Sequence, residues 1–432
     1  MSNLYGVKTT ALVAEKGGLI MFSGSQVKTV LQEREAAFIQ DLELWTNIDS
    51  DTGNLEGSRK IAALLAQRVT KLGGTVEERA NERGVHVIAR FPGDGTLKAL
   101  LVVHTDTVLN TDGGRYPFQR GDNGMAYGPG AGDCKASALQ MLYVVEAFLA
   151  LKAKPYGELI VYFDAEEETG STDEFAFAQE LAQQVDVAII ADTGRPNWGI
   201  VTKRKGNARY TFKIKGIGGH AGNSPQAAGN AVMELGHLLQ GLYELASPLP
   251  KDPENYSTAA LKERKVADYG QFIPPNSINA AVVGTPNEKV NVIPDEAWLK
   301  VEVRCYEQSE LERIDQAIRK LAAQPQVAGT TVEVEGGFVK PPMEKTAAVE
   351  EMVQLYKAIV KREFGADVVE WIAGGMTIGN VTASFTPTID ALGIDCDPLL
   401  EHTRKEEVDL KAFVSRTAAL VLLLAELSAK HS

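Results

Sequence analysis

Imidazole and carboxylate side chains stand directly after several apolar runs of this sequence. His104, Glu168 and Asp192 each follow such a run, and Asp133 follows a glycine-rich stretch. If the runs are parallel strands, their carboxyl ends meet at one edge of a sheet, where open α/β folds place their sites. Imidazole and carboxylate ligands without sulfur suit zinc, cobalt or manganese. The sequence therefore predicts a metal site at this edge.

Asp133 lies in the segment 126–137, where glycines at 128, 130 and 132 let the backbone turn tightly. An apolar, helix-compatible run follows over 138–148, so Asp133 is expected at the entry to a helix. There it would be either an N-cap residue or a carboxylate whose two oxygens bridge two metal ions. The loop alone leaves both interpretations open.

An adjacent glutamate pair and a His-x-Asp pair could carry acid–base chemistry. At a buried strand end, the unpaired carboxylates of Glu167 and Glu168 would repel each other and lose solvation. A cation relieves that cost, with one glutamate as ligand and the other free to act as a base. In an extended chain His104 and Asp106 point the same way, so Asp106 can orient the imidazole. The alternatives are a solvated acidic loop and a capped histidine.

A second imidazole would complete a pair of metal sites. Of the six histidines, His86 falls inside a predicted strand, His237 in the apolar pattern of a helix, and His431 near the chain end. His220 and His402 remain as candidates.

The chain is long enough for two or more domains that would position these residues. It has 432 residues, of which 44% are hydrophobic and 23% charged, as in an ordinary globular enzyme. The net charge of −13 argues against nucleic acid and anionic membrane surfaces as partners. The longest apolar run, near residues 419–424, falls short of a membrane span, so no membrane partner is expected. Three widely spaced cysteines without a CxxC pair favour a reducing, cytoplasmic compartment.

The first half of the chain alternates strands and helices. Helices are expected over 27–45, 55–72, 138–148 and 175–184, and strands over 76–83, 85–91, 97–103, 158–163 and 185–191. This βαβ alternation predicts an α/β domain with a mostly parallel sheet and helices on both faces.

The pattern changes near residue 200 and changes back after residue 345. Strands are expected over 209–214, 278–283, 297–303 and 331–334, helices over 230–245, 310–323 and 410–429, a loop over 216–222 and a polar excursion over 248–269. Such an arrangement predicts an inserted α+β domain at 202–328, between two parts of a catalytic domain at 1–201 and 329–432.

The arrangement of these motifs resembles the di-zinc metallohydrolases that include carboxypeptidases, aminoacylases, deacetylases and tripeptidases. The matching pieces are His104-x-Asp106, the loop with Asp133-x-Lys135, Glu167-Glu168-x-Gly170, Asp192, Gly219-His220-Ala221-Gly222 and His402. They run in the family's order and cover nearly the whole chain. Within the family the chain is most similar to the bacterial glutamate carboxypeptidases that cleave folates, through residues 48–53, 126–130 and 291–304.

The resemblance implies a binuclear zinc centre, with Co²⁺ or Mn²⁺ as substitutes. Asp133 would bridge the metals, His104 and Asp192 would complete one site, and Glu168 and His402 the other. Glu167 would be the general base that deprotonates the bridging water and later protonates the leaving amine, and Asp106 would support His104. Two metals about 3.5–4 Å apart would activate the water and polarise the scissile carbonyl.

The resemblance also implies a homodimer formed through the inserted domain. His220 would reach the partner subunit's site and stabilise the tetrahedral oxyanion. Asn291, Arg304 and Lys340 would help to bind the substrate, a small peptide or N-acyl amino acid, and Gly374 and Gly375 would hold its carboxylate through backbone N–H groups.

The chain departs from its relatives at a few positions of the motifs. It reads Cys134-Lys135-Ala136 where they usually have Asp-Lys-Gly, and Asp192 where glutamate carboxypeptidases have glutamate. The segment 374–378 lacks an aspartate that many relatives carry, and Lys340 replaces an arginine, so a point charge replaces a bidentate fork. These departures bear on the glutamate preference and leave the hydrolytic machinery intact.

The resulting hypothesis is a zinc-dependent hydrolase that releases a C-terminal or N-acylated amino acid. Glutamate is the candidate for that amino acid. The alternatives are a tripeptidase or aminoacylase of the same family and a non-catalytic relative that binds metal or peptide. A P-loop at 128–135 is excluded because Cys134 stands before Lys135 where the motif needs Gly-Lys-Ser/Thr. The N-terminus shows no secretory pattern, and Met1 or Met21 is expected as the start.

Overall fold

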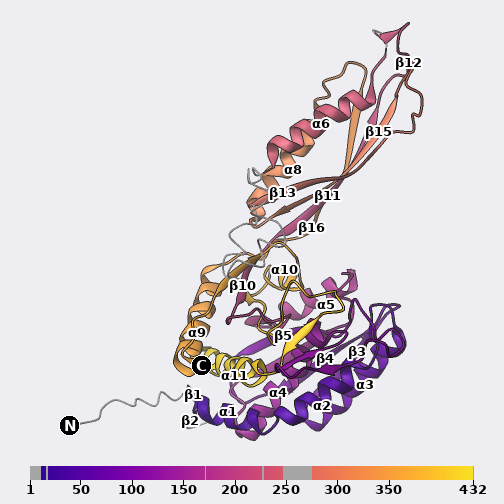
Figure 1. Ribbon diagram of the computed structural model, residues 1–432. Coiled ribbons are helices and arrows are strands. Elements are labelled where there is room, and N and C mark those ends of the chain that lie inside the picture. Colours follow the sequence, from indigo (N-terminus) through magenta and orange to yellow (C-terminus); the bar gives the residue numbers. More distant parts are fainter. Residues whose placement is uncertain (1–10, 16–17, 171, 226–227, 247–274, 432) are drawn as a thin grey trace, which may run out of the picture. The chain divides into compact units, whose positions relative to one another are not determined.

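The computed structural model describes residues 11–15, 18–170, 172–225, 228–246 and 275–431 (Figure 1). The chain divides into two compact units. Unit 1 comprises Met1–Thr202, Lys345–Trp371 and Thr377–Ser432, and unit 2 comprises Lys203–Glu344 and Ile372–Met376. The polar excursion expected over 248–269 lies outside the described residues.

Unit 1 is built on a six-stranded sheet. Its strands, in spatial order, are β18 (Thr388–Ile389), β9 (Val187–Ile190), β5 (Lys98–His104), β8 (Glu158–Asp164), β4 (Val85–Pro92) and β3 (Thr75–Ala80). The first four are parallel, while β4 and β3 are antiparallel and form the predicted strand pair on one edge. The mostly parallel sheet expected from the βαβ alternation is confirmed.

Helices cover both faces of this sheet. One face carries α1 (Gly24–Gln32), α2 (Glu35–Thr46), α3 (Leu55–Lys71), α4 (Ala136–Ala150), α9 (Ala347–Phe364) and α11 (Ala412–His431), and the other carries α5 (Thr172–Ala182) and α10 (Gly379–Thr382). Alternate residues of β5 serve the two cores: Leu101 and Val103 pack on the first side, Leu100 and Val102 on the second. Burial on both faces is why this strand reads as one continuous apolar run.

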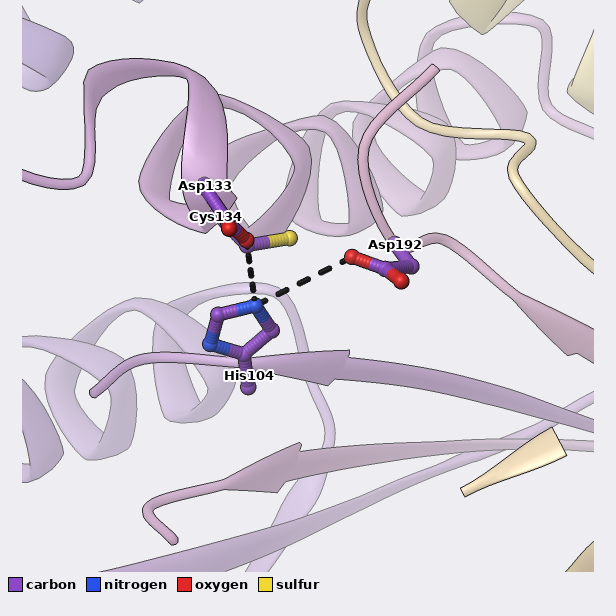
Figure 2. Close-up of side chains that lie close together, drawn as sticks. All are labelled: His104, Asp133, Cys134 and Asp192. Carbon is purple, nitrogen blue, oxygen red and sulfur yellow. Dashed lines mark hydrogen bonds and ion pairs between the residues drawn. The ribbon is translucent and has the colours of Figure 1, made fainter. Parts of the chain in front are cut away.

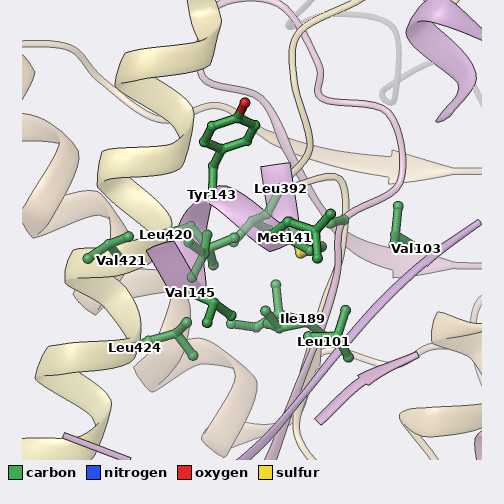
Figure 3. Packing of buried hydrophobic residues seen from close by; sticks show 14 of the residues in the cluster. Leu101, Val103, Met141, Tyr143, Val145, Ile189, Leu392, Leu420, Val421 and Leu424 are labelled. Atoms are coloured by element: carbon green, nitrogen blue, oxygen red, sulfur yellow. The ribbon is translucent and has the colours of Figure 1, made fainter. Parts of the chain in front are cut away.

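Helix α11 is the centre of the larger core, extending the apolar run noted near residues 419–424. Figure 3 shows Leu420 and Leu424 of α11 beside Val145 of α4, with Leu101 of β5 nearby. Within the described residues α11 is the one helix long and apolar enough to cross a membrane, but 72% of its most apolar window is buried inside the protein. Such burial is that of a core helix in a globular domain.

The single helix predicted over 27–45 is wrong, because the chain breaks into α1 and α2 at Glu33 and Arg34. The backbone N–H of Arg34 bonds the carbonyl of Leu31, three residues back, and its guanidinium donates to the carbonyl of Val30 at 2.7 Å. A side chain thus satisfies the carbonyl that a continuous helix would have used, so the helical ladder stops there.

Unit 2 is an antiparallel sheet with two helices packed on one face. The strand order is β13 (Asn276–Gly284), β15 (Glu296–Cys305), β11 (Gly206–Lys215) and β16 (Thr331–Lys340), and the helices are α6 (Ala231–Leu245) and α8 (Gln308–Ala323). Asn230 caps α6 by accepting the N–H groups of Val232 and Met233. Strand β11 alternates buried and exposed residues, as expected of a sheet with one covered face.

Short strands complete the two units. They are β1 (Ala11–Glu15), β2 (Gly18–Phe22), β6 (Gln119–Arg120), β7 (Met125–Tyr127), β19 (Glu407–Asp409), β10 (Ile200–Arg204), β17 (Glu370–Ala373), β12 (Gly219–His220) and β14 (Val292–Ile293). The chain passes between the units within β10, after Glu344, within β17 and after Met376. The loop expected over 216–222 contains β12, which pairs with β14.

Candidate metal centre and active site

His104 ends β5 and points its ring at two carboxylates, as Figure 2 shows. Its Nδ1 donates to the backbone carbonyl of Asp106 at 3.1 Å, with the Asp106 carboxylate 3.4 Å away. Its Nε2 lies 2.8 Å from Oδ1 of Asp133 and 3.9 Å from Oδ1 of Asp192. Asp106 therefore contacts the imidazole as expected. Its backbone carbonyl lies closer to Nδ1 than its carboxylate does.

Asp133 lies in a distorted helical turn, η1 (Ala131–Lys135), rather than at a helix cap. Helix α4 begins after this turn with Lys135 as its N-cap residue, so the N-cap interpretation of Asp133 is wrong. The two carboxylate oxygens of Asp133 face different partners. Oδ1 meets Nε2 of His104 at 2.8 Å, while Oδ2 meets Nε2 of His402 at 3.3 Å.

Glu168 and His402 form the second group around Asp133. Nε2 of His402 lies 3.1 Å from Oε2 of Glu168, whose side chain is only 5% exposed. The other oxygen of Glu168 is buried and has no hydrogen-bond partner among the described residues. His402 is held at φ 61°, a left-handed conformation that a histidine rarely adopts. The glutamate pair is therefore part of a buried cluster and not a solvated loop.

The Asp106 carboxylate also fixes the backbone of the glutamate pair. It accepts the N–H of Glu167 and the N–H of Glu168, each at 3.2 Å, and the hydroxyl of Thr52 at 2.7 Å. Glu167 lines a small pocket at the carboxyl ends of β5, β8 and β9. The other residues that line it are Val102, Val103, His104, Asp164, Ile190, Asp192, Thr377 and Ile378.

The carboxylates of this cluster differ strongly in acidity. Burial, reinforced by Asp192 and Glu168, raises the pKa of Glu167 well above its usual range. Burial also raises the pKa of Glu168 to about 7, although the hydrogen bond to His402 opposes the shift. For Asp133, hydrogen bonds from both imidazoles outweigh burial and lower the pKa. Asp133 thus stays ionised, as a metal-bridging carboxylate must, while Glu167 and Glu168 are the more basic carboxylates of the cluster.

The imidazoles are shifted in the opposite sense. Burial opposes a charge on His104, but its neighbours Cys134, Asp106 and Asp133 outweigh it and raise the pKa. Hydrogen bonds to Asp133 and Glu168 raise the pKa of His402.

The donor atoms fit two metal ions that share Asp133. One group contains His104, Asp133, Cys134 and Asp192, the other contains Asp133, Glu168 and His402, and within each group the ligand atoms lie within 4.8 Å of one another. Dications would pair with these clustered carboxylates and with the orphaned oxygen of Glu168. Imidazole and carboxylate donors are those of zinc sites.

Several residues that support the cluster were not predicted. Glu406 accepts the backbone N–H groups of Gly132 and Asp133 at 3.1 and 3.0 Å. Glu401, next to His402, binds the hydroxyl of Thr193 at 2.8 Å and the guanidinium of Arg195 at 2.6 Å. In the sequence these two glutamates look like ordinary exposed acidic residues. Their partners are backbone groups and side chains far away in the chain, which no local motif records.

A second buried polar cluster lies behind the glutamate pair. His86 of β4 lies 2.9 Å from Oδ1 of Asp164 and 3.1 Å from Oε2 of Glu166, and the hydroxyl of Tyr162 lies 3.0 Å from its Nδ1. Burial opposes the charge on His86, but these two carboxylates outweigh it and raise its pKa. The contacts of His86 with Asp164 and Glu166 stabilise the turn between β8 and Glu167.

The predicted substrate-binding residues fall into two sets within unit 2. His220 of β12 and Asn291 share one ribbon, because His220 pairs with Val292 and the Asn291 carbonyl accepts the N–H of Ala221 at 3.0 Å. Backbone N–H groups of Gly222 and Asn223 donate to Nδ1 of His220, so its Nε2 carries the proton.

The other set lies at the opposite end of β11. The guanidinium of Arg304 donates to the carbonyl of Gly374 at 3.0 Å, beside Gly375. Asn207 of β11 is in register with both Arg304 and Lys340. Strand β11 runs from Gly206 to Lys215, so about 30 Å of strand separates this set from the ribbon that carries His220.

Comparison with known proteins identifies the class. The model of peptidase family M20/M25/M40 matches residues 100–426. The chain belongs to this family and is a metallohydrolase that acts on amide bonds.

Individual relatives agree with this assignment. The chain is 26% identical to carboxypeptidase G2 of Pseudomonas sp. (strain RS-16), over 98% of this chain and 95% of that protein. It is 25% identical to succinyl-diaminopimelate desuccinylase of Paracoccus denitrificans, over 76% of this chain and 84% of that protein. Aminopeptidase PepT of Bacillus cereus shares the fold with a TM-score of 0.71 at 18% identity, covering 91% of this chain and 98% of that structure.

Proposed function

We propose that this protein is a di-zinc carboxypeptidase or amidohydrolase that releases a C-terminal or N-acylated amino acid. The observation that carries the proposal is the divergence of the two Asp133 oxygens toward His104 and His402. Such a carboxylate can bridge two cations, with Asp192 completing one site and Glu168 the other. The similarity to carboxypeptidase G2 over nearly the whole chain supports the carboxypeptidase branch.

His104, Asp133, Asp192, Glu168 and His402 would hold two metal ions, which would supply Lewis acidity to polarise the scissile carbonyl and activate a water. Glu167 takes the proton of that water on its carboxylate and later passes it to the leaving amine nitrogen. Burial raises the pKa of Glu167, which makes its carboxylate a better proton acceptor. Asp106 holds Glu167 in place through the backbone N–H.

We assign the acidic end of the substrate to the Arg304, Lys340 and Gly374–Gly375 region. The Arg304 guanidinium already lies against Gly374 at 3.0 Å, so one substrate carboxylate could meet a cation and backbone N–H groups together. Lys340 offers a point charge in this region. An arginine guanidinium would hold a carboxylate in a more fixed orientation through two hydrogen bonds. We therefore propose an acidic amino acid as the released product.

We also propose a homodimer in which His220 acts on the partner's substrate. About 30 Å of β11 separates the His220–Asn291 ribbon from Arg304, too far for one small substrate to touch both in one chain. In a dimer, the second copy would supply the His220–Asn291 ribbon to the substrate bound at Arg304. The protonated Nε2 of His220 suits it to donate a hydrogen bond to an oxyanion.

Strand β13 offers a surface for this dimer. Among the described residues it is an edge strand of the unit 2 sheet, and Val282 and Val283 are 47% and 53% exposed. Unpaired edge strands with exposed apolar side chains readily pair with a second chain. A cytoplasmic location remains a prediction that fits three free, buried cysteines.

Amino-acid release by the purified, zinc-loaded protein tests the proposal. The substrates are N-acyl and N-aminoacyl derivatives of glutamate, aspartate, leucine and arginine, each assayed with and without a chelator. Chelator-sensitive release of glutamate or aspartate is expected. Release of leucine or arginine alone would move the protein to an aminoacylase or tripeptidase branch. If both metals are bound and nothing is released, the protein is a non-catalytic relative.

A further inference from the structure

The metal group around His104 contains a donor that the predicted ligand set leaves out. The sulfur of Cys134 lies with Nε2 of His104 and with carboxylate oxygens of Asp133 and Asp192 in one group, all within 4.8 Å of one another. Figure 2 shows the sulfur on the side of Asp133 that faces Asp192, above the imidazole ring. Its position matches that of a fourth ligand to a cation placed between these atoms.

A buried cysteine more often serves as a small apolar side chain. Cys134 is fully buried, and its thiol makes a weak hydrogen bond to the carbonyl of Ala191 at 3.4 Å. However, its neighbours are an imidazole and two carboxylates, which is not the surrounding of an apolar packing residue. Cys396 provides the contrast: it is also buried, but among the described residues it belongs to neither metal group.

We propose that Cys134 binds the metal ion at His104 and Asp192 through its sulfur, which makes this a four-ligand site. The proposal rests on the metal centre proposed above. When the ion binds, a sulfur–metal bond forms, the thiol proton passes to solvent, and the hydrogen bond to Ala191 is given up. The ligands are then Nε2 of His104, Oδ1 of Asp133, a carboxylate oxygen of Asp192 and Sγ of Cys134.

A fourth ligand makes the two halves of the centre unequal. Zinc sites with four protein ligands are closed and hold the ion tightly, whereas sites with three keep a position open for water or substrate. The group of Asp133, Glu168 and His402 has three. The sulfur also favours zinc or cobalt over manganese at the His104 side, because thiolate is a soft ligand. We infer that the ion beside His104 is held more firmly, while the open position lies beside His402.

The test is the absorption spectrum of the full-length protein loaded with two equivalents of Co²⁺. A thiolate bound to Co²⁺ gives a strong charge-transfer band in the near ultraviolet, which carboxylates and imidazoles do not. We expect this band in the unmodified protein and in Cys396→Ser, and its loss in Cys134→Ser. We also expect a chelator to remove one of the two ions from Cys134→Ser about tenfold faster or more. Cys134→Asp, which carries the residue usual in relatives, should also lack the band, and it replaces the serine variant if that fails to fold.

The outcomes separate the two proposals. Two bound ions without the band, or a band that persists in both Cys134 variants, would overturn the sulfur ligand and leave the binuclear centre standing. Failure to bind Co²⁺ or Zn²⁺ at all would overturn the proposed centre itself. Loss of the band in Cys396→Ser alone would identify Cys396 as the sulfur ligand and reject the proposal for Cys134.

Discussion

The carboxylate of Glu406 lies 3.0 Å from the backbone nitrogen of Asp133 and accepts its N–H. The same oxygen accepts the N–H of Gly132. Burial and the neighbouring Asp133 raise the pKa of Glu406 to about 8, so its carboxyl is largely neutral at pH 7. Two buried N–H groups at the turn that presents Asp133 therefore depend on one acceptor.

Replacing Glu406 tests this dependence. Glu406→Ala leaves both N–H groups buried without a partner, and we expect a loss of about 2–4 kcal/mol in unfolding free energy together with weaker metal retention. Glu406→Gln keeps a carbonyl acceptor and mimics the neutral carboxyl, so it should lose less than about 1 kcal/mol. Denaturant unfolding and metal analysis of the two variants check this. Equal losses in both would show that the acceptor oxygen is not what matters.

Glu167→Gln should stop turnover without disturbing the metal centre. The amide cannot take the proton of the attacking water, so we expect kcat to fall by about 10²–10⁴ while metal content and melting temperature stay unchanged. Steady-state kinetics and metal analysis of the same preparation provide the comparison. Near-normal turnover would exclude Glu167 as the base.

Metal affinity should rise with pH. The pKa of His402 is raised by Asp133 and Glu168, and that of His104 is raised by its neighbours, so both imidazoles carry protons in the metal-free protein near neutral pH. A metal must displace those protons, and each one released makes the apparent affinity about tenfold greater per pH unit. Calorimetry in buffers of different ionisation enthalpy counts the protons. Binding without proton release would contradict the charged state of both rings.

His86→Gln should destabilise unit 1 in a pH-dependent way. The imidazolium lies between Asp164 and Glu166, and because its folded pKa is raised, its stabilising effect is complete below about pH 6.5 and is lost as pH rises through the folded pKa. We expect a loss of about 3–5 kcal/mol at low pH and a smaller one above the folded pKa of His86. The exposed His237→Gln serves as the matched control. A pH-independent difference would assign His86 a packing role only.

Mixed subunits test whether the active site is shared. His220→Ala and Glu167→Gln should each be inactive alone. If His220 serves the partner's site, mixed dimers hold one intact site, and random exchange should recover roughly a quarter of normal activity. Size-exclusion chromatography must first show a dimer. Failure of the mixture to recover activity, with exchange demonstrated by differently tagged subunits, would place His220 outside the partner's site.

The sequence alone was enough to predict the mostly parallel sheet of unit 1 and the positions of its chemistry. Apolar runs buried on both faces, such as 97–103, are distinctive, and they bring His104 and Asp192 to one edge. The order of the motifs was enough to indicate the family. These features are local in the chain, so periodicity and spacing record them.

Only the tertiary structure decided which atoms meet. The break between α1 and α2 comes from a side chain of Arg34 that caps a carbonyl, and helix periodicity does not register that contact. The support of Asp133 by Glu406 joins residues 273 positions apart. The place of Cys134 in the metal group depends on the turn at 131–135. The residue pattern of this segment does not predict the φ and ψ angles of that turn. Side-chain direction and long-range partners depend on how elements pack, which is why a ligand set read from motifs omitted the sulfur.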